Sequence, residues 1–160
     1  MTVMVTQARA EPHRVVPAPG IGSMAEEASL DELIGALRNP SVVFGDAATP
    51  GMRATCEMAD WAASAAALKR ILAFHGTPPA DMLAALRLAG EFARKHGLRL
   101  YGSPWFCTFD VDGMWARYDI HTTLEWQEAI SWDDRFMDVL VAQRMDRGSF
   151  HLQFSGRGPL

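Results

Sequence analysis

The sequence predicts an α+β fold in which helices, including an αα-hairpin, pack on one face of a small, mainly antiparallel sheet. Helical periodicity extends over residues 29–38, 56–75, 78–96 and 132–146, whereas apolar and polar residues alternate over 105–127 and again over 149–154. Helices and strands are therefore grouped along the chain rather than strictly alternating. A length of 160 residues suits one domain that buries a core without disulfides.

Proline and glycine punctuate the first 28 residues, which show no sustained periodicity, so we expect a flexible N-terminal arm over 1–28. Ser29 and Glu32 form a capping box for the first helix, which Asn39-Pro40 ends. The next residues, Ser-Val-Val-Phe at 41–44, suit a short strand. A single domain is expected over 29–156, with a frayed C-terminus over 157–160.

Two helices are predicted in the middle of the chain, over 56–75 and 78–96. Gly76 suits the left-handed position after the first helix, and Thr77 followed by Pro78 suits the start of the second. Because the connection is short, we expect the two helices to lie antiparallel, side by side. A strand over 98–101 is predicted to follow.

A β-hairpin is predicted around Asp112-Gly113, a sequence that favours a two-residue type I′ turn. Such a turn pairs Val111 with Met114 and Cys107 with Tyr118. One face of the hairpin is then apolar and predicted to enter the core, with Trp105, Cys107, Phe109, Ala116, Tyr118 and Ile120. The other face is predicted to carry Phe106, Thr108, Asp110, Trp115, Arg117, Asp119 and His121.

Alternation continues beyond the hairpin, which favours a strand to about Gln127. Thr122 and Glu125 also fit a capping box, so a short helix over 123–130 is the alternative. Ser131 is predicted to cap the helix over 132–146, and the alternating residues 149–154 are predicted to form the last strand.

The formal net charge of −4 argues against a nucleic-acid partner, because phosphate contacts need clustered basic residues. Two cysteines without a CxxC pair, and glycines outside any phosphate-binding loop, lead us to expect neither a metal nor another cofactor. No apolar run approaches the ~20 residues of a membrane span, and we expect a cytoplasmic protein without membrane contact. Only two of the 15 basic residues are lysines, which is typical of GC-rich, bacterial coding sequence.

The polar face of the predicted hairpin is the strongest candidate for function. An indole beside a guanidinium is the composition of protein-interface hot spots. We therefore expect a small binding or regulatory protein, such as an inhibitor or adaptor, that docks a protein partner. The predicted contact residues are Trp115, Arg117, Asp119, His121, Phe106 and Asp110. The sheet edge or the helix pair could also support a homo-oligomer.

A small enzyme is the alternative function. Asp119 and His121 on one strand face could act as an acid–base pair, with Glu125 and Ser103 as further catalytic candidates. The same row of Asp, His and Glu could instead bind a metal ion, although ligands along one straight strand converge poorly. Cys107 is expected on the opposite face from His121, which excludes a Cys–His nucleophile.

Overall fold

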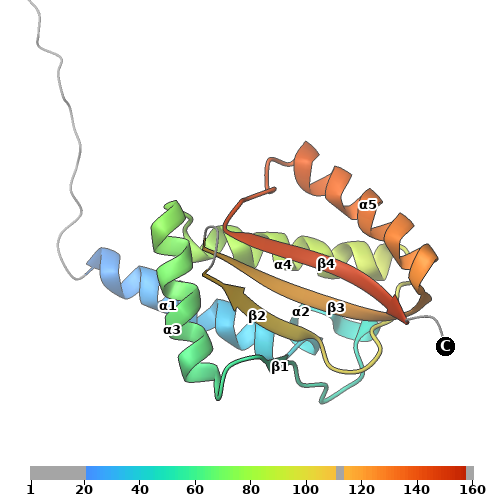
Figure 1. The fold of residues 1–160 in the computed structure, drawn as a ribbon, viewed down its shortest axis with the longest axis horizontal. Coiled ribbons are helices and arrows are strands. Elements are labelled where there is room, and N and C mark those ends of the chain that lie inside the picture. Colours follow the sequence, from blue (N-terminus) through green and yellow to red (C-terminus); the bar gives the residue numbers. More distant parts are fainter. Residues whose placement is uncertain (1–20, 111–113, 158–160) are drawn as a thin grey trace, which may run out of the picture.

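The computed structural model describes residues 21–110 and 114–157. The first described elements are helix α1 (Ile21–Arg38), the single turn α2 (Ser41–Phe44) and the 3-10 turn η2 (Gly45–Ala47). Strand β1 (Thr55–Cys56) and helices α3 (Trp61–His75) and α4 (Pro79–Lys95) come next. Strands β2 (Trp105–Phe109) and β3 (Trp115–Glu125), helix α5 (Trp126–Ala142) and strand β4 (Phe150–Arg157) complete the described chain (Figure 1).

The four strands form one mixed sheet in the order β1-β2-β3-β4. Only β2 and β3 pair antiparallel, whereas β1 lies parallel to β2 and β4 lies parallel to β3. Parallel neighbours need a crossover, and helices supply it: α3 and α4 connect β1 to β2, and α5 connects β3 to β4. The predicted α+β class is confirmed, and the sheet is mixed rather than mainly antiparallel.

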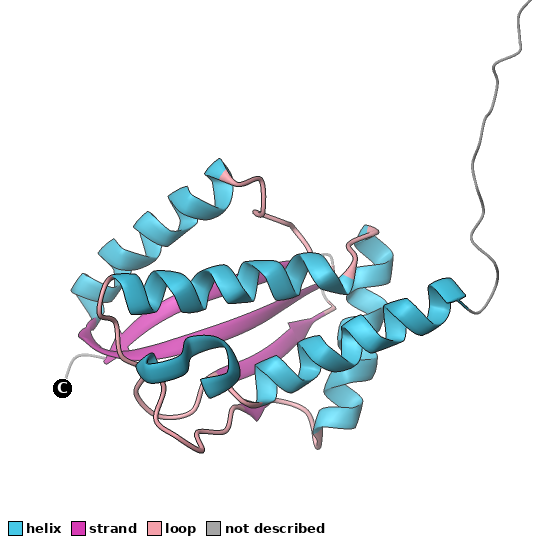
Figure 2. Ribbon diagram, turned by 180° about the vertical axis from the view of Figure 1, so that it is seen from behind, coloured by secondary structure: helices cyan, strands magenta, loops and turns pink. Residues whose placement is uncertain are grey.

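The helices gather on one side of the sheet. Figure 2 shows α1, α2 and α4 in front of the strands, and α5 lies along the β4 edge. Alternate residues of β3 and β4 point into this layer and are buried: Ala116, Tyr118, Ile120, Phe150, Leu152 and Phe154. Phe92 of α4 and Phe136 of α5 meet Phe154 with ring centroids 5.7 and 5.2 Å apart. The core therefore lies between the sheet and the helices.

Several element boundaries differ from those predicted. Helix α1 begins at Ile21, so Ser29 lies inside it and does not cap it. Residues 41–44 form a helical turn and not a strand, because α4 passes so close to Val43 that a Cβ on Gly90 would meet the Val43 carbonyl. Residues 98–101 contribute only a bridge between Leu100 and Thr122. Strand β3 ends at Glu125, and one helix, α5, covers most of both the alternative helix over 123–130 and the predicted helix over 132–146.

Helices α3 and α4 do not form the predicted side-by-side pair. Gly76 does end α3 in the left-handed conformation, with φ 65°. The backbone of Pro78 is extended, however. Helix α4 therefore runs across the sheet at a steep angle to α3 (Figure 1). Helix α4 packs mainly on α1 and α2, whereas α3 packs on β2, β3 and α1. The two helices therefore share α1 as a neighbour but otherwise pack on different elements.

The predicted hairpin register is wrong by one residue. Cys107 lies opposite Arg117 and not opposite Tyr118, and Phe106 pairs with Tyr118. A one-residue slip exchanges the two faces of a strand. Phe106 therefore enters the core, where it stacks on Trp61 with ring centroids 5.7 Å apart, whereas Trp105 and Phe109 face away from the helices. The predicted turn at Asp112-Gly113 and its Val111–Met114 pair lie outside the described residues.

Candidate functional site

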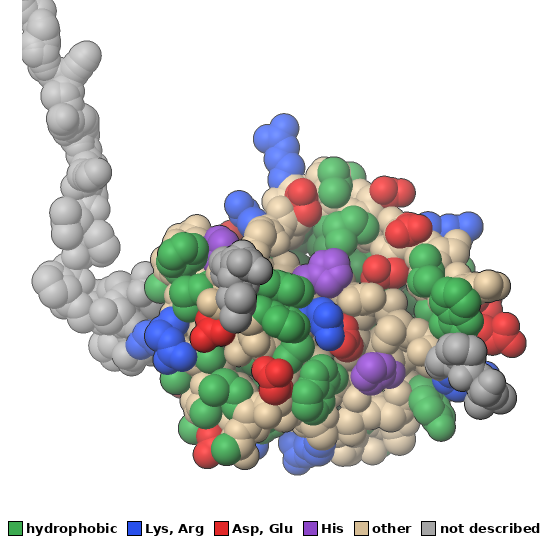
Figure 3. All heavy atoms as spheres, viewed as in Figure 1, with side chains coloured by type: hydrophobic (Ala, Val, Ile, Leu, Met, Phe, Trp, Pro, Cys, Tyr) green, Lys and Arg blue, Asp and Glu red, His purple; other side chains and the backbone are tan. Residues whose placement is uncertain are grey.

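The sheet has one face that the helices within residues 21–110 and 114–157 leave uncovered, which we call the open face. In Figure 1 this face is turned toward the viewer, and no described helix passes in front of β2 and β3. The strand pairings bring together the following side chains on it: Trp105, Cys107, Phe109, Trp115, Arg117, Asp119, His121, His151, Gln153 and Ser155. Figure 3 shows hydrophobic side chains at the β2–β3 hairpin end and a strip of charged and histidine side chains beside them.

The aromatic end of the open face is built by cross-strand pairing. Phe109 and Trp115 are Cα partners, and their rings stack with centroids 4.2 Å apart and an interplanar angle of 14°. Trp105 lies further along β2, opposite Asp119. All three aromatic side chains are only partly buried. Aromatic surface that stays partly exposed on one face is typical of a binding surface.

Arg117 and Asp119 form an ion pair next to this aromatic end. The Arg117 Nε lies 3.2 Å from Asp119 Oδ1, and the guanidinium carbon lies 5.4 Å from the centre of the Phe109 ring. Nε is buried and its angle to Asp119 falls outside hydrogen-bond geometry, so the contact is an ion pair only. The two side chains remain 33% and 14% exposed. Asp119 and Phe109 thus hold the inner part of the guanidinium in place.

His121 has its contact on β4. Its Nδ1 lies 2.9 Å from Ser155 Oγ, because β3 and β4 run parallel and bring these residues into register. Asp119 pairs with Arg117 rather than with His121, so the predicted acid–base pair is not assembled. Ser103 is exposed in the segment before β2, and Glu125 is exposed at the end of β3. The predicted catalytic residues therefore come from β3 and from the segment before β2, and Asp119 and His121 have separate partners.

Two predicted contact residues occupy other places than expected. Phe106 is fully buried in the core because of the shifted register, and it cannot contact a partner. Asp110 is exposed directly after β2, at the hairpin end of the sheet. Trp105 and Phe109 instead belong to the open face, and the hydrophobic pattern alone placed them in the core. The β4 residues His151 and Gln153 were also missed, although their alternation with Leu152 and Phe154 predicted which side they face.

Cys107 lies on the open face, contrary to the prediction, yet only 3% of it is exposed. Burial raises the pKa of its thiol, although the nearby Arg117 opposes this shift. His121 is on the same face, but it lies four residues further along β3 than Arg117, the partner of Cys107, which is about 13 Å. Cys56 pairs beside Phe106 on the other face, and both cysteines are free thiols. This arrangement does not support a Cys–His nucleophile.

Within residues 21–110 and 114–157, no cluster of three His, Cys, Asp or Glu side chains is arranged to hold a metal ion. In the same part of the chain, no helix combines the length and apolar character that crossing a membrane requires.

A shallow hollow lies on the open face between β3, β4 and the segment that precedes β4. Its volume is about 390 Å³, and it is open to solvent. Arg117, His151 and Gln153 line it from the strands, and Arg147 lines it from the preceding segment, where it pairs with Asp81 at 3.1 Å. The remaining lining residues are Trp115, Gly148 and Phe150. This hollow joins the aromatic end of the open face to its charged strip.

Comparisons of the chain with protein-family models, with curated proteins and with solved structures yield no match. The chemistry of the open face is therefore the basis for a functional assignment.

Proposed function

We propose that this protein is a small regulatory protein, an inhibitor or adaptor, that docks a protein partner through its open face. The observation that carries the proposal is the aromatic surface of Trp105, Phe109 and Trp115, which lies partly exposed beside Arg117 on an uncovered sheet face. Tryptophan and arginine dominate the binding energy of protein interfaces. The stacked pair of Phe109 and Trp115 is already ordered, so little conformational entropy is lost when a partner binds.

The charge of the molecule supports a protein over a nucleic acid as partner. Asp110 and Asp119 lie beside the aromatic end, and the whole chain carries a formal net charge of −4. These charges repel a phosphate backbone. Two free cysteines are typical of a reducing compartment, which supports a cytoplasmic location.

The enzyme hypothesis draws less support from the same face. Asp119 is engaged by Arg117, and His121 is engaged by Ser155. A general base must lie within hydrogen-bond distance of the substrate proton that it removes. It also needs a neighbouring group that adjusts its pKa. Among the described residues, the side-chain partner of His121 is therefore Ser155 and not Asp119.

The test compares Trp115→Ala with a matched control, Trp126→Ala. Trp126 is 43% exposed at the start of α5 and lies outside the open face. Each full-length variant is used to capture proteins from source-cell lysate, and the captured proteins are quantified and then tested as purified partners. We expect one protein to lose at least tenfold in affinity with Trp115→Ala and to bind the Trp126 variant normally.

Two outcomes would contradict the proposal. One is capture that is equal for both variants, and the other is loss of the fold in Trp115→Ala, seen as a lost thermal transition. Trp115→Phe separates packing from docking, because it keeps a ring to stack on Phe109 but lacks the indole. Sedimentation at two concentrations identifies a second copy of this chain as the occupant, which also contradicts docking of a different protein.

A further inference from the structure

The hollow between Trp115 and β4 has an unusual set of charges for an acidic protein. Two guanidinium groups and one imidazole line it, from Arg117, Arg147 and His151, and none of its lining residues is acidic. The Gln153 amide and the Trp115 indole complete its rim. This lining offers hydrogen-bond donors and positive charge next to an aromatic surface.

Arg117 is positioned as an anion-binding group. Its Nε side faces Asp119, and its guanidinium lies against the Phe109 ring. Within the described residues the two Nη groups form no hydrogen bond, so the outer edge of the guanidinium is available to a ligand. A guanidinium held in this way matches the two oxygens of a carboxylate.

Arg147 extends this positive surface, and His151 places an imidazole next to it. Arg147 pairs only with Asp81 among the described residues, and both side chains are more than a third exposed, at 48% and 38%. An exposed ion pair of this kind is weak, so Arg147 can exchange Asp81 for another carboxylate at little cost. His151 is the Cα partner of Arg117 on β4, which places the two groups side by side.

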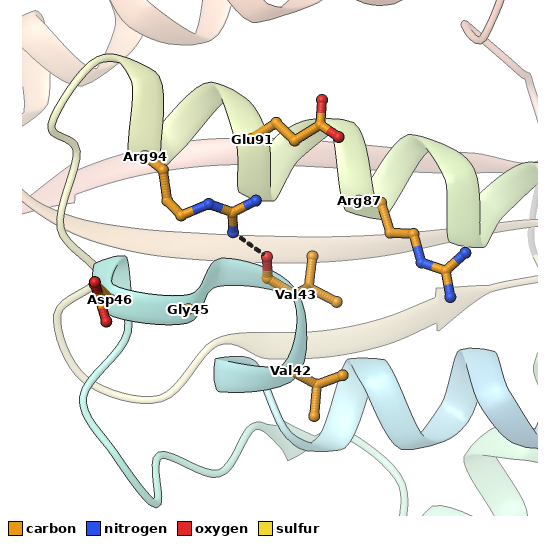
Figure 4. Close-up of a pocket in the computed structure, with 7 residues that line it drawn as sticks. All are labelled: Val42, Val43, Gly45, Asp46, Arg87, Glu91 and Arg94. Carbon is orange, nitrogen blue, oxygen red and sulfur yellow. Dashed lines mark hydrogen bonds between the residues drawn. The ribbon is translucent and has the colours of Figure 1, made fainter.

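A second hollow in the described part of the chain also has two arginines in its lining, but its other lining residues differ. Figure 4 shows Arg94 reaching from α4 to the turn that carries Val43 and Asp46, whereas the Glu91 side chain points away from that turn. That hollow has a volume of about 480 Å³, and two acidic residues, Glu91 and Asp46, are among those that line it. Arg94 there donates to the Val43 carbonyl, which fixes it within the fold. Its chemistry is therefore that of a solvated surface.

We propose that the hollow beside Trp115 is a carboxylate subsite that binds an acidic side chain of the partner. This inference rests on the proposed function, and it states which chemistry the docked segment presents: a carboxylate for Arg117 and Arg147, next to an apolar group that packs on Trp115. A single carboxylate suits the site better than a chain of phosphates, because Asp81 and Asp119 are paired with its two arginines.

The test is a titration of the full isotope-labelled chain with N-acetylglutamate N-methylamide, followed by NMR. We expect a millimolar dissociation constant, with shifts centred on the Trp115 indole N–H and on His151. Arg147→Gln is expected to weaken binding about tenfold. Arg87→Gln is the matched control, because Arg87 also forms an exposed ion pair, at 3.3 Å from Glu32, but lines the other hollow. It is expected to leave binding unchanged.

Three outcomes would overturn the carboxylate subsite: equal binding of the neutral N-acetylglutamine N-methylamide, equal weakening by Arg87→Gln, or tighter binding of inorganic phosphate at the same residues. The result is separable from the proposed function. Partner capture that depends on Trp115 without any binding of the acid leaves docking intact and removes the subsite. Binding of the acid without such capture leaves the subsite and removes the docking proposal.

Discussion

Tyr118 connects the sheet to the first helix through one buried hydrogen bond. Its hydroxyl donates to the Leu37 carbonyl at 2.8 Å, near the end of α1, and the side chain is fully buried. Burial raises the pKa of this phenol far above its usual range, so it stays protonated and remains a donor. The bond joins two segments that lie far apart along the chain.

We expect Tyr118→Phe to lower the free energy of unfolding by about 1–2 kcal/mol, because it leaves the Leu37 carbonyl without its donor. Urea unfolding measures the change. Tyr101→Phe is the control, because Tyr101 is 57% exposed and its loss of a hydroxyl should have no measurable effect. Equal stability of the two variants would contradict this role for Tyr118.

Asp133 of α5 carries a second connection at the residue scale. Its Oδ1 accepts a hydrogen bond from the Phe154 N–H at 2.8 Å, on β4. Burial raises the pKa of this carboxyl, and the nearby Asp134 and Asp119 add to the shift, whereas the Phe154 bond and His151 oppose it. The folded state therefore holds its proton to a higher pH than the unfolded state does. Stability consequently falls as the pH rises from the ordinary value to the raised folded value.

We expect Asp133→Asn to keep or raise the stability at pH 7, because the amide oxygen still accepts from Phe154 without carrying a buried charge. Its unfolding free energy should also vary less across that pH window. Asp133→Ala should instead lose about 1–2 kcal/mol, since Phe154 N–H loses its acceptor. Urea unfolding from pH 4 to 7 measures both, and an Asn variant less stable than the unmodified protein at pH 7 would refute the expected direction.

At the scale of elements, the contact between α2 and α4 explains why a valine pair adopts a helical turn. Val42-Val43 favours a strand by local propensity. The turn buries Val43 and Phe44, and α4 approaches it at Gly90, where there is no side chain. Packing against α4 therefore outweighs the local preference of residues 41–44 for a strand.

We expect Gly90→Ala to lower the free energy of unfolding by about 2–3 kcal/mol, because its Cβ would overlap the Val43 carbonyl and lie 2.8 Å from Val43 Cγ1. Gly35→Ala in α1 should raise it by about 0.5–1 kcal/mol, because nothing lies within 4 Å of the added carbon and alanine favours a helix. Thermal unfolding compares the two. Similar changes in both variants would show that α2 and α4 are not tightly packed.

The crossover helices explain the mixed sheet. The sequence predicted a helix between the last two strands, and such a helix can serve as the crossover that parallel neighbours need. Helix α5 returns the chain to the starting end of β3, where Phe150 pairs with Ala116. The direction of β4 relative to β3 therefore depends on the path of α5. The alternation within β4 indicated only which of its side chains are buried.

At the scale of the whole molecule, stability is concentrated in the middle of the sheet. Strand β3 has a neighbour on each side and buries Ala116, Tyr118 and Ile120 under the helices. Strand β1 contributes only Thr55 and Cys56 at one edge. More contacts must therefore break before water reaches the backbone of β3 than before it reaches the backbone of β1.

We expect the amide protons of β3 to exchange most slowly, at a rate set by global unfolding, and those of Thr55 and Glu57 to exchange through local opening. Hydrogen exchange followed by NMR at two urea concentrations separates the two kinds of opening, because only global unfolding depends strongly on urea. Protection of β1 equal to that of β3 would contradict a core centred on β3.

The sequence by itself determined the α+β class, the approximate helices over 56–96, and the buried parity of β3 and β4, because these depend on periodicity within one segment. Only the tertiary structure decided that Phe106 enters the core while Trp105 and Phe109 face outward. That choice depends on contacts between distant segments, such as Phe106 with Trp61 and Tyr118 with Leu37. Both faces of β2 are apolar enough to be buried, so its local pattern could not distinguish them.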